Sequence, residues 1–311
     1  MAVIGIDLGG TKISGAVFDS EGNRLHQTEH LLKGRKGAEA GQLVAQTIDE
    51  LRQISIKAIG ISVPGISDTK TGRVWAPNIP GWESYPLKKE VEDLLGNPAI
   101  AVEIAGDRSC YILGEIWKGA ARGAKDAVFI SVGTGIGMGI LANGRILDGH
   151  AGISGAAGWM ALDTEFEEDY VQYGCFESNA SGNGIARRAQ RLLNGNEFPD
   201  SLLKSCSVEK ITAHEVFAAW AKNDALAVQV IDRAVQMWGM AAANVVSLFN
   251  PEMIVWGGGV FGPAAQLLHR IREEACRWAQ PVAMRHTGFV VSELGGNAGL
   301  FGAGRLALGI L

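Results

Sequence analysis

The chain has 311 residues, of which 47% are hydrophobic and 20% are charged, and its net charge is −5. This length predicts two domains with ordinary globular cores, and the acidic balance argues against a nucleic-acid partner. The most apolar stretch, residues 127–142, is interrupted by glycines and is a poor membrane span. The four cysteines of the protein form no CxxC pair, and no basic leader precedes the first strand. We therefore expect a cytoplasmic protein.

Runs of apolar and β-branched residues predict the elements of the first half. Three strands in a meander are expected at 3–7, 13–19 and 24–30. They are followed by a helix over 38–53, a strand at 57–62, a helix over 86–95, a strand at 99–103 and a helix that opens at Asp107. Further strands at 126–132, 137–142 and 145–147 repeat the opening meander. The sequence therefore predicts a duplicated architecture.

The C-terminal part reads as mostly helical. Apolar residues at helical spacing predict a long buried helix between Asp224 and Asn250, then a strand at 253–256 and a helix over 263–280. A final helix over 300–311 is expected to return to the first domain. The predicted domains are 1–118 with 298–311, and 119–297.

Two glycine-rich turns follow the first strand of each half. One is the stretch D-L-G-G-T-K at residues 7–12, and the other is G-T-G-I-G-M-G at residues 133–139. Each lies between apolar runs and therefore reads as the tip of a β-hairpin, where glycine allows positive φ and close approach of a ligand. Backbone amides at such tips bind anions, although an ordinary tight hairpin has the same pattern. Two such turns together favour a polyphosphate ligand.

A third glycine cluster, at Gly257, Gly258 and Gly259, separates the strand at 253–256 from the next helix. It is either a plain strand-to-helix turn or a place where a flat ring or a phosphate approaches the backbone. The basic residues at 33–36 and at Arg187, Arg188 and Arg191 are interpreted as solvated surface.

These motifs, in this order, resemble the ROK family of sugar kinases along essentially the whole chain. The resemblance rests on residues 7–12, V-P-G at 63–65, P-N-I-P-G-W at 77–82, G-D at 106–107, L-G-E at 113–115, residues 133–139, G-C-F-E at 174–177, A-S-G at 180–182 and residues 257–260. It implies an α/β fold of two ribonuclease H-like domains, as in actin and hexokinase, with an interdomain cleft that closes around its substrates.

The resemblance also implies roles for particular residues. Asp107 would be the general base that takes the proton of the sugar hydroxyl, although its place before a helix is also that of an N-cap. Asp7 would hold Mg²⁺ through water. The ATP phosphates would be bound by Gly9, Gly10, Thr11, Lys12, Gly133, Thr134, Gly135, Gly257, Gly258 and Gly259. The sugar would contact Asp107, Gly65, Asn78 and Glu177, and this chain's own Trp159 is a further candidate contact.

The sequence departs from the family pattern on the acceptor side. The family has Asn before the catalytic Asp, where this chain has Gly106, and a Gly-Glu-x-Gly-His segment, where this chain has G-A-A-G-W at 155–159. Three hydroxyl-binding side chains are thus replaced, so we expect an acceptor other than plain glucose. Trp159 either stacks on a sugar or aglycone, or fills space in the core. His150 is interpreted as a surface residue or a further acceptor contact.

The same departures predict that no zinc is bound. Family members hold zinc with that His and three cysteines, and here the positions are Trp159, Glu168, Tyr170 and Cys175, so one ligand is left. The acidic run Glu165, Glu167, Glu168 and Asp169 is interpreted as a solvated loop rather than a replacement site.

The function expected from the sequence is ATP- and Mg²⁺-dependent phosphorylation of a sugar or sugar derivative by a homodimer. A sugar-responsive regulator of the same fold would carry a winged helix before the first phosphate turn, whereas this chain starts at that strand. The remaining alternative is a nucleotide-binding sensor or pseudokinase, against which the presence of Asp107 argues.

Overall fold

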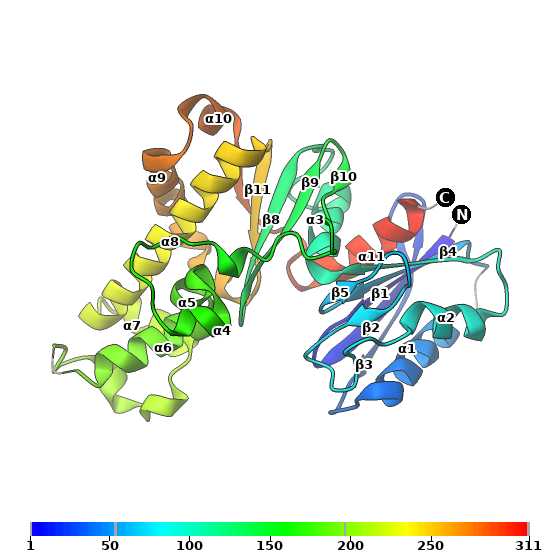
Figure 1. The fold of residues 1–311 in the computed structure, drawn as a ribbon, viewed down its shortest axis with the longest axis horizontal. Coiled ribbons are helices and arrows are strands. Elements are labelled where there is room, and N and C mark those ends of the chain that lie inside the picture. Colours follow the sequence, from blue (N-terminus) through cyan, green and yellow to red (C-terminus); the bar gives the residue numbers. More distant parts are fainter. Residues whose placement is uncertain (1, 53–54, 196, 310–311) are drawn as a thin grey trace. The chain divides into compact units, whose positions relative to one another are not determined.

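The computed structural model describes residues 2–52, 55–195 and 197–309 (Figure 1). They form two compact units. The first comprises Met1–Ala124, Gly139–Ser154 and Ser292–Leu311, and the second comprises Lys125–Met138 and Gly155–Val291. The domain division predicted from the sequence, with boundaries after residue 118 and before residue 298, stays a prediction.

A five-stranded sheet forms the centre of the first unit, in the order β3-β2-β1-β4-β7. Its strands are β1 (Ala2–Leu8), β2 (Lys12–Asp19), β3 (Arg24–Leu31), β4 (Ala58–Val63) and β7 (Ala101–Gly106). The first three are antiparallel neighbours, whereas β4 and β7 continue the sheet in parallel. Every residue of β4 is buried, as expected for a parallel strand with both faces covered.

Helices cover both faces of this sheet. The helices α1 (Gly37–Leu51) and α2 (Leu87–Leu95) share one apolar core with the inward side chains of β1 and β4. On the other face, α11 (Ala298–Gly309) packs on β1 and β4 and against α3 (Asp107–Lys118). The two helices cross closely, because a Cβ atom at Gly302 would lie 1.8 Å from the carbonyl oxygen of Cys110. This packing fixes the first turn of α3, where Asp107 lies.

The second five-stranded sheet has the order β10-β9-β8-β11-β12. It contains β8 (Ala127–Val132), β9 (Ile136–Ala142), β10 (Arg145–Ile146), β11 (Met253–Gly257) and β12 (Gly288–Val291). A meander of three strands is again extended by two parallel strands, β11 beside β8 and β12 beside β11. The predicted duplication is therefore confirmed at the level of strand order and direction.

The helices of the second unit pack around α8 (Ala225–Phe249). Its neighbours are α5 (Cys175–Ala180), α6 (Gly182–Leu193), α7 (Ala213–Trp220), α9 (Leu268–Trp278) and α10 (Pro281–His286). Trp238 of α8 is fully buried, and its indole donates to the carbonyl of Ala180 at 3.1 Å. The predicted long buried helix is thus correct.

A buried carboxylate joins two segments of the first unit. Glu115 of α3 is wholly buried and accepts hydrogen bonds from the amides of Ala120, at 2.7 Å, and Leu294, at 3.2 Å, and from the hydroxyl of Ser292. Because a buried charge is stable only when its lone pairs are satisfied, these contacts hold the segment after α3 to the segment before α11.

Several predicted bounds were wrong. The strand expected at 99–103 is β7, two or three residues later. The helix expected over 263–280 begins as a 3-10 turn over Pro263–Leu267, and α9 begins only at Leu268. The predicted final helix is α11, which packs in the first unit as expected. Residues 310–311 of this predicted helix, and residue 53 of the first predicted helix, lie outside the described chain. Short elements not predicted are β5 (Ile66–Ser67), β6 (Val74–Trp75) and α4 (Asp169–Tyr173).

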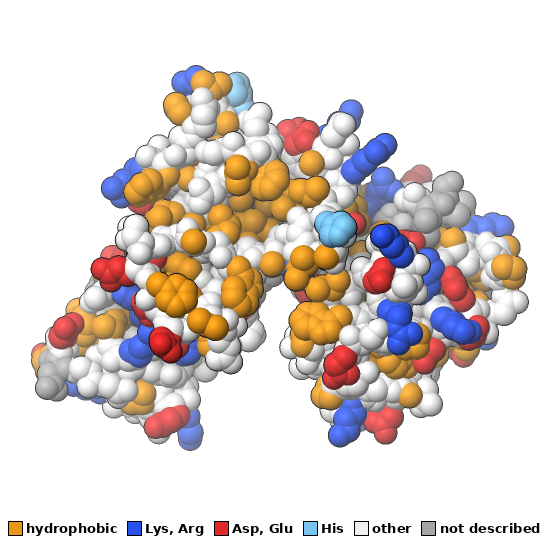
Figure 2. Space-filling model, in the orientation of Figure 1, with side chains coloured by type: hydrophobic (Ala, Val, Ile, Leu, Met, Phe, Trp, Pro, Cys, Tyr) orange, Lys and Arg blue, Asp and Glu red, His pale blue; other side chains and the backbone are white. Residues whose placement is uncertain are grey.

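The charged side chains are mixed on the surface. Basic and acidic groups are interspersed on the face shown in Figure 2 rather than gathered into one basic patch, as the net charge of −5 leads one to expect. Among the described residues, no helix has the length and hydrophobicity needed to cross a bilayer.

Candidate active site

Asp7 lies near the end of β1, directly beside Ser62 on the parallel strand β4. Burial raises the pKa of its carboxyl group to about 6; the Ser62 hydroxyl opposes this rise, while the negative charge of Asp107 adds to it. The neighbouring helix α11 comes close to this carboxylate, since a Cβ atom at Gly299 would lie 2.5 Å from Oδ1. Gly299 therefore makes room for an acidic group that the fold keeps from bulk water.

Asp107 is the first residue of α3, and its carboxylate is held in place by its own helix. Oδ1 accepts the amide of Arg108 at 2.8 Å, and Oδ2 accepts the Tyr111 hydroxyl at 3.3 Å. Gly106 occupies the N-cap position, so the N-cap interpretation of Asp107 was wrong. Burial raises the pKa of Asp107, against the effect of the Arg108 charge. A carboxylate with a raised pKa and a fixed orientation is suited to accept a proton.

Close backbone packing explains why position 106 is a glycine. A Cβ atom there would lie 2.7 Å from the carbonyl oxygen of Gly65, and one at Gly65 would lie 2.0 Å from the carbonyl oxygen of Trp75. The backbone segments before Asp107 and after β4 therefore touch, which leaves no space for the Asn of the family pattern. Asn78 is exposed, and its Cβ lies 4.0 Å from where a Cβ of Gly10 would be.

The first glycine turn joins β1 to β2, as predicted. The amide of Gly9 donates to the carbonyl of Lys12 at 2.9 Å, which closes the turn over exposed Gly10 and Thr11. The amino group of Lys12 is paired with Glu29 of β3 at 2.7 Å. A phosphate bound here would therefore share Lys12 with Glu29.

The second glycine turn is shorter than predicted. It comprises Gly133, Thr134 and Gly135, closed by a 2.9 Å bond from the Gly133 amide to the Gly135 carbonyl, whereas residues 136–139 belong to β9. None of the glycines at 9, 10, 133 or 135 has a left-handed φ, so that expectation was wrong. Gly133 leaves its backbone open to a ligand rather than adopting a left-handed φ, because no neighbouring atom lies within 4 Å of a Cβ built there.

Gly258 does have the left-handed conformation, with φ of +89°. A Cβ atom there would lie 2.4 Å from the carbonyl oxygen of Val132, so the turn after β11 packs directly on the end of β8. Of its two neighbours, Gly257 is buried and Gly259 has open space around it. A cavity of about 520 Å³ begins beside this turn. It is lined by Gly133, Thr134, Gly182, Asn183, Ala186, Arg187, Gln190, Glu209, Ile211, Thr212, Ala213, His214, Phe217, Gly259, Val260 and Pro263.

Glu177, a predicted sugar contact, supports the second glycine turn. Its Oε2 accepts the amide of Ile136 at 2.7 Å and lies 2.6 Å from where a Cβ of Gly135 would be. A Cβ atom at Gly158 would come within 2.9 Å of the same carboxylate. Burial raises the pKa of Glu177, whereas the Ile136 amide and the Arg187 charge act to lower it. Glu177 thus joins the second glycine turn to the segment that carries Trp159.

Trp159 ends a short 3-10 turn, and 56% of its surface is exposed. The alternative that it fills space in the core was therefore wrong, while its predicted role in sugar binding stays a prediction. The turn is held from behind by Gly174, where a Cβ atom would lie 2.4 Å from the carbonyl oxygen of Gly158. His150 is exposed on another turn, and its role stays open.

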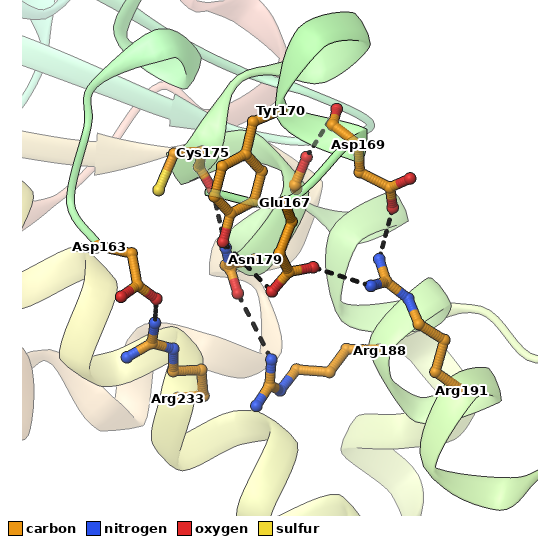
Figure 3. A network of polar contacts seen from close by, with 10 residues as sticks. Asp163, Glu167, Asp169, Tyr170, Cys175, Asn179, Arg188, Arg191 and Arg233 are labelled. Carbon is orange, nitrogen blue, oxygen red and sulfur yellow. Dashed lines mark hydrogen bonds and ion pairs between the residues drawn. The ribbon is translucent and has the colours of Figure 1, made fainter. Parts of the chain in front are cut away.

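A network of polar side chains surrounds Tyr170 and Cys175, two of the four positions at which the sequence comparison sought zinc ligands (Figure 3). The amide of Asn179 donates to the Tyr170 hydroxyl at 3.0 Å and to the Cys175 carbonyl at 2.9 Å. Arg191 pairs with Glu167 at 3.0 Å and with Asp169 at 2.5 Å. In the described part of the chain, no three His, Cys, Asp or Glu side chains are placed to hold a metal.

The acidic run is solvated, as interpreted. Glu165 and Glu168 are exposed, and the side chains of Glu167 and Asp169 are 44% and 40% exposed in their pairs with Arg191 of α6. Asp163, just before the run, is paired with Arg233 of α8.

Comparison with known proteins places the chain in a class and then in a family. A glucokinase from Streptomyces griseus, solved in complex with glucose and AMPPNP, superimposes with a TM-score of 0.78 at 30% identity over 99% of this chain and 100% of that one. The chain thus has the fold of actin and hexokinase, as predicted, and its structural match is a phosphotransferase. The profile of the ROK family matches residues 3–310, and the chain belongs to that family.

Two curated relatives differ in the sugar that they are named for. A glucokinase from Halalkalibacterium halodurans is 34% identical, with 97% of this chain and 94% of the relative covered. An N-acetyl-D-glucosamine kinase from Pectobacterium atrosepticum is 28% identical, with 82% of this chain and 83% of the relative covered. Family membership therefore does not decide the acceptor.

Sequence reasoning missed Ser62, Gly299 and the far wall of the large cavity. A serine inside the apolar strand 58–63 was a signal for Ser62, and the small residues at 299–304 were a signal for a close helix crossing. The cavity wall at residues 209–217 has no such local pattern.

Proposed function

We propose that this protein transfers the γ-phosphoryl group of ATP to a hydroxyl group of a sugar or sugar derivative. The observation that carries the proposal is Asp107, a fixed carboxylate with a raised pKa at the start of α3, in a chain of the ROK family. As general base it would take the hydroxyl proton while the sugar oxygen attacks phosphorus, a role worth about 10²- to 10⁴-fold in rate.

The donor would be held by the glycine turns. The open backbone at Gly10 and Gly133 and the hydroxyl groups of Thr11 and Thr134 offer hydrogen-bond donors to phosphate oxygens. The cavity beside Gly133 and Gly259, at about 520 Å³, is large enough for a nucleoside. A relative solved with AMPPNP supports ATP as the donor.

Asp7 fits a role in holding Mg²⁺. Its carboxylate is shielded from solvent, and the nearby Lys12, whose charge acts to lower the pKa of Asp7, is itself paired with Glu29. Hard carboxylate oxygens suit Mg²⁺, which usually keeps several of its waters. When bound, the ion would neutralise charge on the phosphate oxygens. The first turn of α11 would bound the space around the Asp7 carboxylate, since Gly299 lies against it.

For the acceptor we propose Gly65, Asn78, Trp159 and Glu177 as contacts, and a sugar other than plain glucose. The support is the absence of the Glu and His of the family segment at Ala156 and Trp159, together with the exposed indole. An exposed indole offers a flat apolar face to a sugar ring or an aglycone. The alternative function is a nucleotide-binding sensor without efficient turnover.

The remaining expectations are also proposals. A homodimer is implied by the family and is tested by light scattering of the purified chain. A cytoplasmic location agrees with the four cysteines Cys110, Cys175, Cys206 and Cys276, all of which are free thiols.

The test is ADP release with Mg-ATP and a panel of hexoses, amino sugars, N-acetyl sugars and glycosides. We expect one sugar to raise the rate strongly, and Asp107→Asn to lower that rate at least 100-fold while ATP still binds. Asp93→Asn, on the surface of α2, is the control and should leave the rate unchanged. Equal turnover by wild type and Asp107→Asn would refute the assignment.

A further inference from the structure

Arg187 lies on the face of α6 that lines the large cavity. Asn183, Ala186, Arg187 and Gln190 recur at the three- and four-residue spacing of one helix face, and all four line this cavity. Gly133 and Thr134 of the second glycine turn line it as well. The interpretation of Arg187 as solvated surface was therefore wrong.

The guanidinium group of Arg187 is held in position but is not satisfied by hydrogen bonds. Its Cζ atom lies 4.1 Å from the centroid of the Tyr173 ring, over the ring face. Nε and Nη2 are both buried, and neither donates to an acceptor within residues 2–52, 55–195 and 197–309. Buried N–H donors of a charged group that lack an acceptor carry a free-energy penalty, and a bound anion removes it.

The cavity places Arg187 beside the second glycine turn. Gly133, Thr134 and Arg187 all line it, and the positive charge of Arg187 acts to lower the pKa of the Glu177 carboxyl. Glu177 in turn accepts the Ile136 amide at the second glycine turn. The cation is thus next to a turn whose Gly133 backbone is open and whose Thr134 is exposed. A cation, a hydroxyl group and backbone amides together form a set of donors for phosphate oxygens.

We propose that Arg187 binds phosphate oxygens of the nucleotide, with the Tyr173 ring holding its guanidinium in position for them. This inference rests on the proposed ATP-dependent function and adds a residue for which sequence reasoning gave no role. Arg187 would hold the leaving diphosphate or the transferred phosphoryl group and so stabilise the charge that develops during transfer.

The experiment compares ATP with adenosine, because adenosine lacks the phosphates that Arg187 is proposed to bind. Calorimetric titrations of both into wild type, Arg187→Gln, Arg187→Lys and Arg191→Gln are required. For Arg187→Gln we expect the affinity for ATP to fall roughly 10- to 100-fold and that for adenosine to change less than about twofold. Arg187→Lys should recover part of the loss, because it keeps the charge without the planar fork.

Arg191→Gln is the matched control. Arg191 lies one turn further along α6 and is half-exposed in its pairs with Glu167 and Asp169. It should keep the wild-type affinity for both ligands. Thermal unfolding of each variant tests whether the fold is intact, and Tyr173→Leu, which removes the supporting ring, should weaken ATP binding less than Arg187→Gln does.

Two results would overturn the inference. An equal loss of ATP and adenosine affinity in Arg187→Gln would mean that Arg187 only shapes the cavity. Unchanged ATP affinity with a raised KM for sugar would mean that it acts on the acceptor through Glu177. If the wild type binds ATP and phosphorylates a sugar, either result refutes only the role proposed for Arg187. A wild type that binds no ATP would refute the proposed function as well.

Discussion

Replacing Asp7 by Asn should stabilise the protein in the absence of nucleotide and Mg²⁺, although it should abolish activity. Burial raises the pKa of Asp7 from the ordinary 3.8 to about 6, so the folded state disfavours the ionised form. Each pKa unit corresponds to about 1.4 kcal/mol, so ionised Asp7 costs about 3 kcal/mol of unfolding free energy above pH 6.

The pH dependence identifies the cause. Between pH 3.8 and about 6 the folded state binds more protons than the unfolded state, so the stability of the wild type falls as the pH rises through this window. The penalty is about 1 kcal/mol at pH 4.5 and about 3 kcal/mol at pH 8. Asn does not titrate, so the advantage of Asp7→Asn over wild type should grow by about 2 kcal/mol between these two pH values.

Urea unfolding at pH 4.5 and pH 8, with EDTA and without ATP, measures this difference. Asp19→Asn in the same unit is the control with the opposite sign, because the Asn23 side chain and backbone amides lower the pKa of Asp19 and its charge is stabilising. An Asp7→Asn variant whose advantage is absent, or shrinks, as the pH rises would refute the argument that burial raises the pKa of Asp7.

Three further predictions concern other parts of the molecule. The acid limb of the kcat profile should lie above pH 3.8, because burial raises the pKa of the base Asp107 and the rate is lost when it is protonated; a limb at or below 3.8 contradicts this. Glu115→Gln should lower the unfolding free energy by roughly 1–3 kcal/mol in urea titrations, since the amide NH₂ group would face backbone donors; an unchanged midpoint contradicts this. A zinc chelator should leave the melting temperature unchanged, because Cys175 has Tyr170 and Asn179 around it rather than further metal ligands; a clear drop means a metal is bound.

The sequence predicted the features that local patterns encode. Apolar runs and glycine turns indicated both meanders, and the repeated order of strands follows from them. The helix opening at Asp107 and the long helix α8 were also visible, because their apolar residues recur at helical spacing. These signals arise from burial of one face of an element, which leaves a period in the sequence.

The contacts that complete the candidate site have no such period. Glu177 meets Ile136 across 41 residues, and Asp163 meets Arg233 across 70 residues. Neither pairing changes local composition, so a charged run is interpreted as solvated surface even where Arg187 lies half-buried over the Tyr173 ring. The glycine turns were located correctly, but whether a glycine serves positive φ or open space depends on neighbours from other strands, as at Gly133 and Gly258.

The central claim, sugar phosphorylation that depends on Asp107, is tested most directly by product analysis. Wild type and Asp107→Asn are incubated with Mg-ATP and each sugar of the panel, and sugar phosphate and ADP are quantified by mass spectrometry. We predict one sugar that wild type converts to its phosphate in equal amount to the ADP formed, with at least 100-fold less product from Asp107→Asn. ATP binding by wild type without sugar phosphate from any acceptor would contradict the claim and favour the sensor.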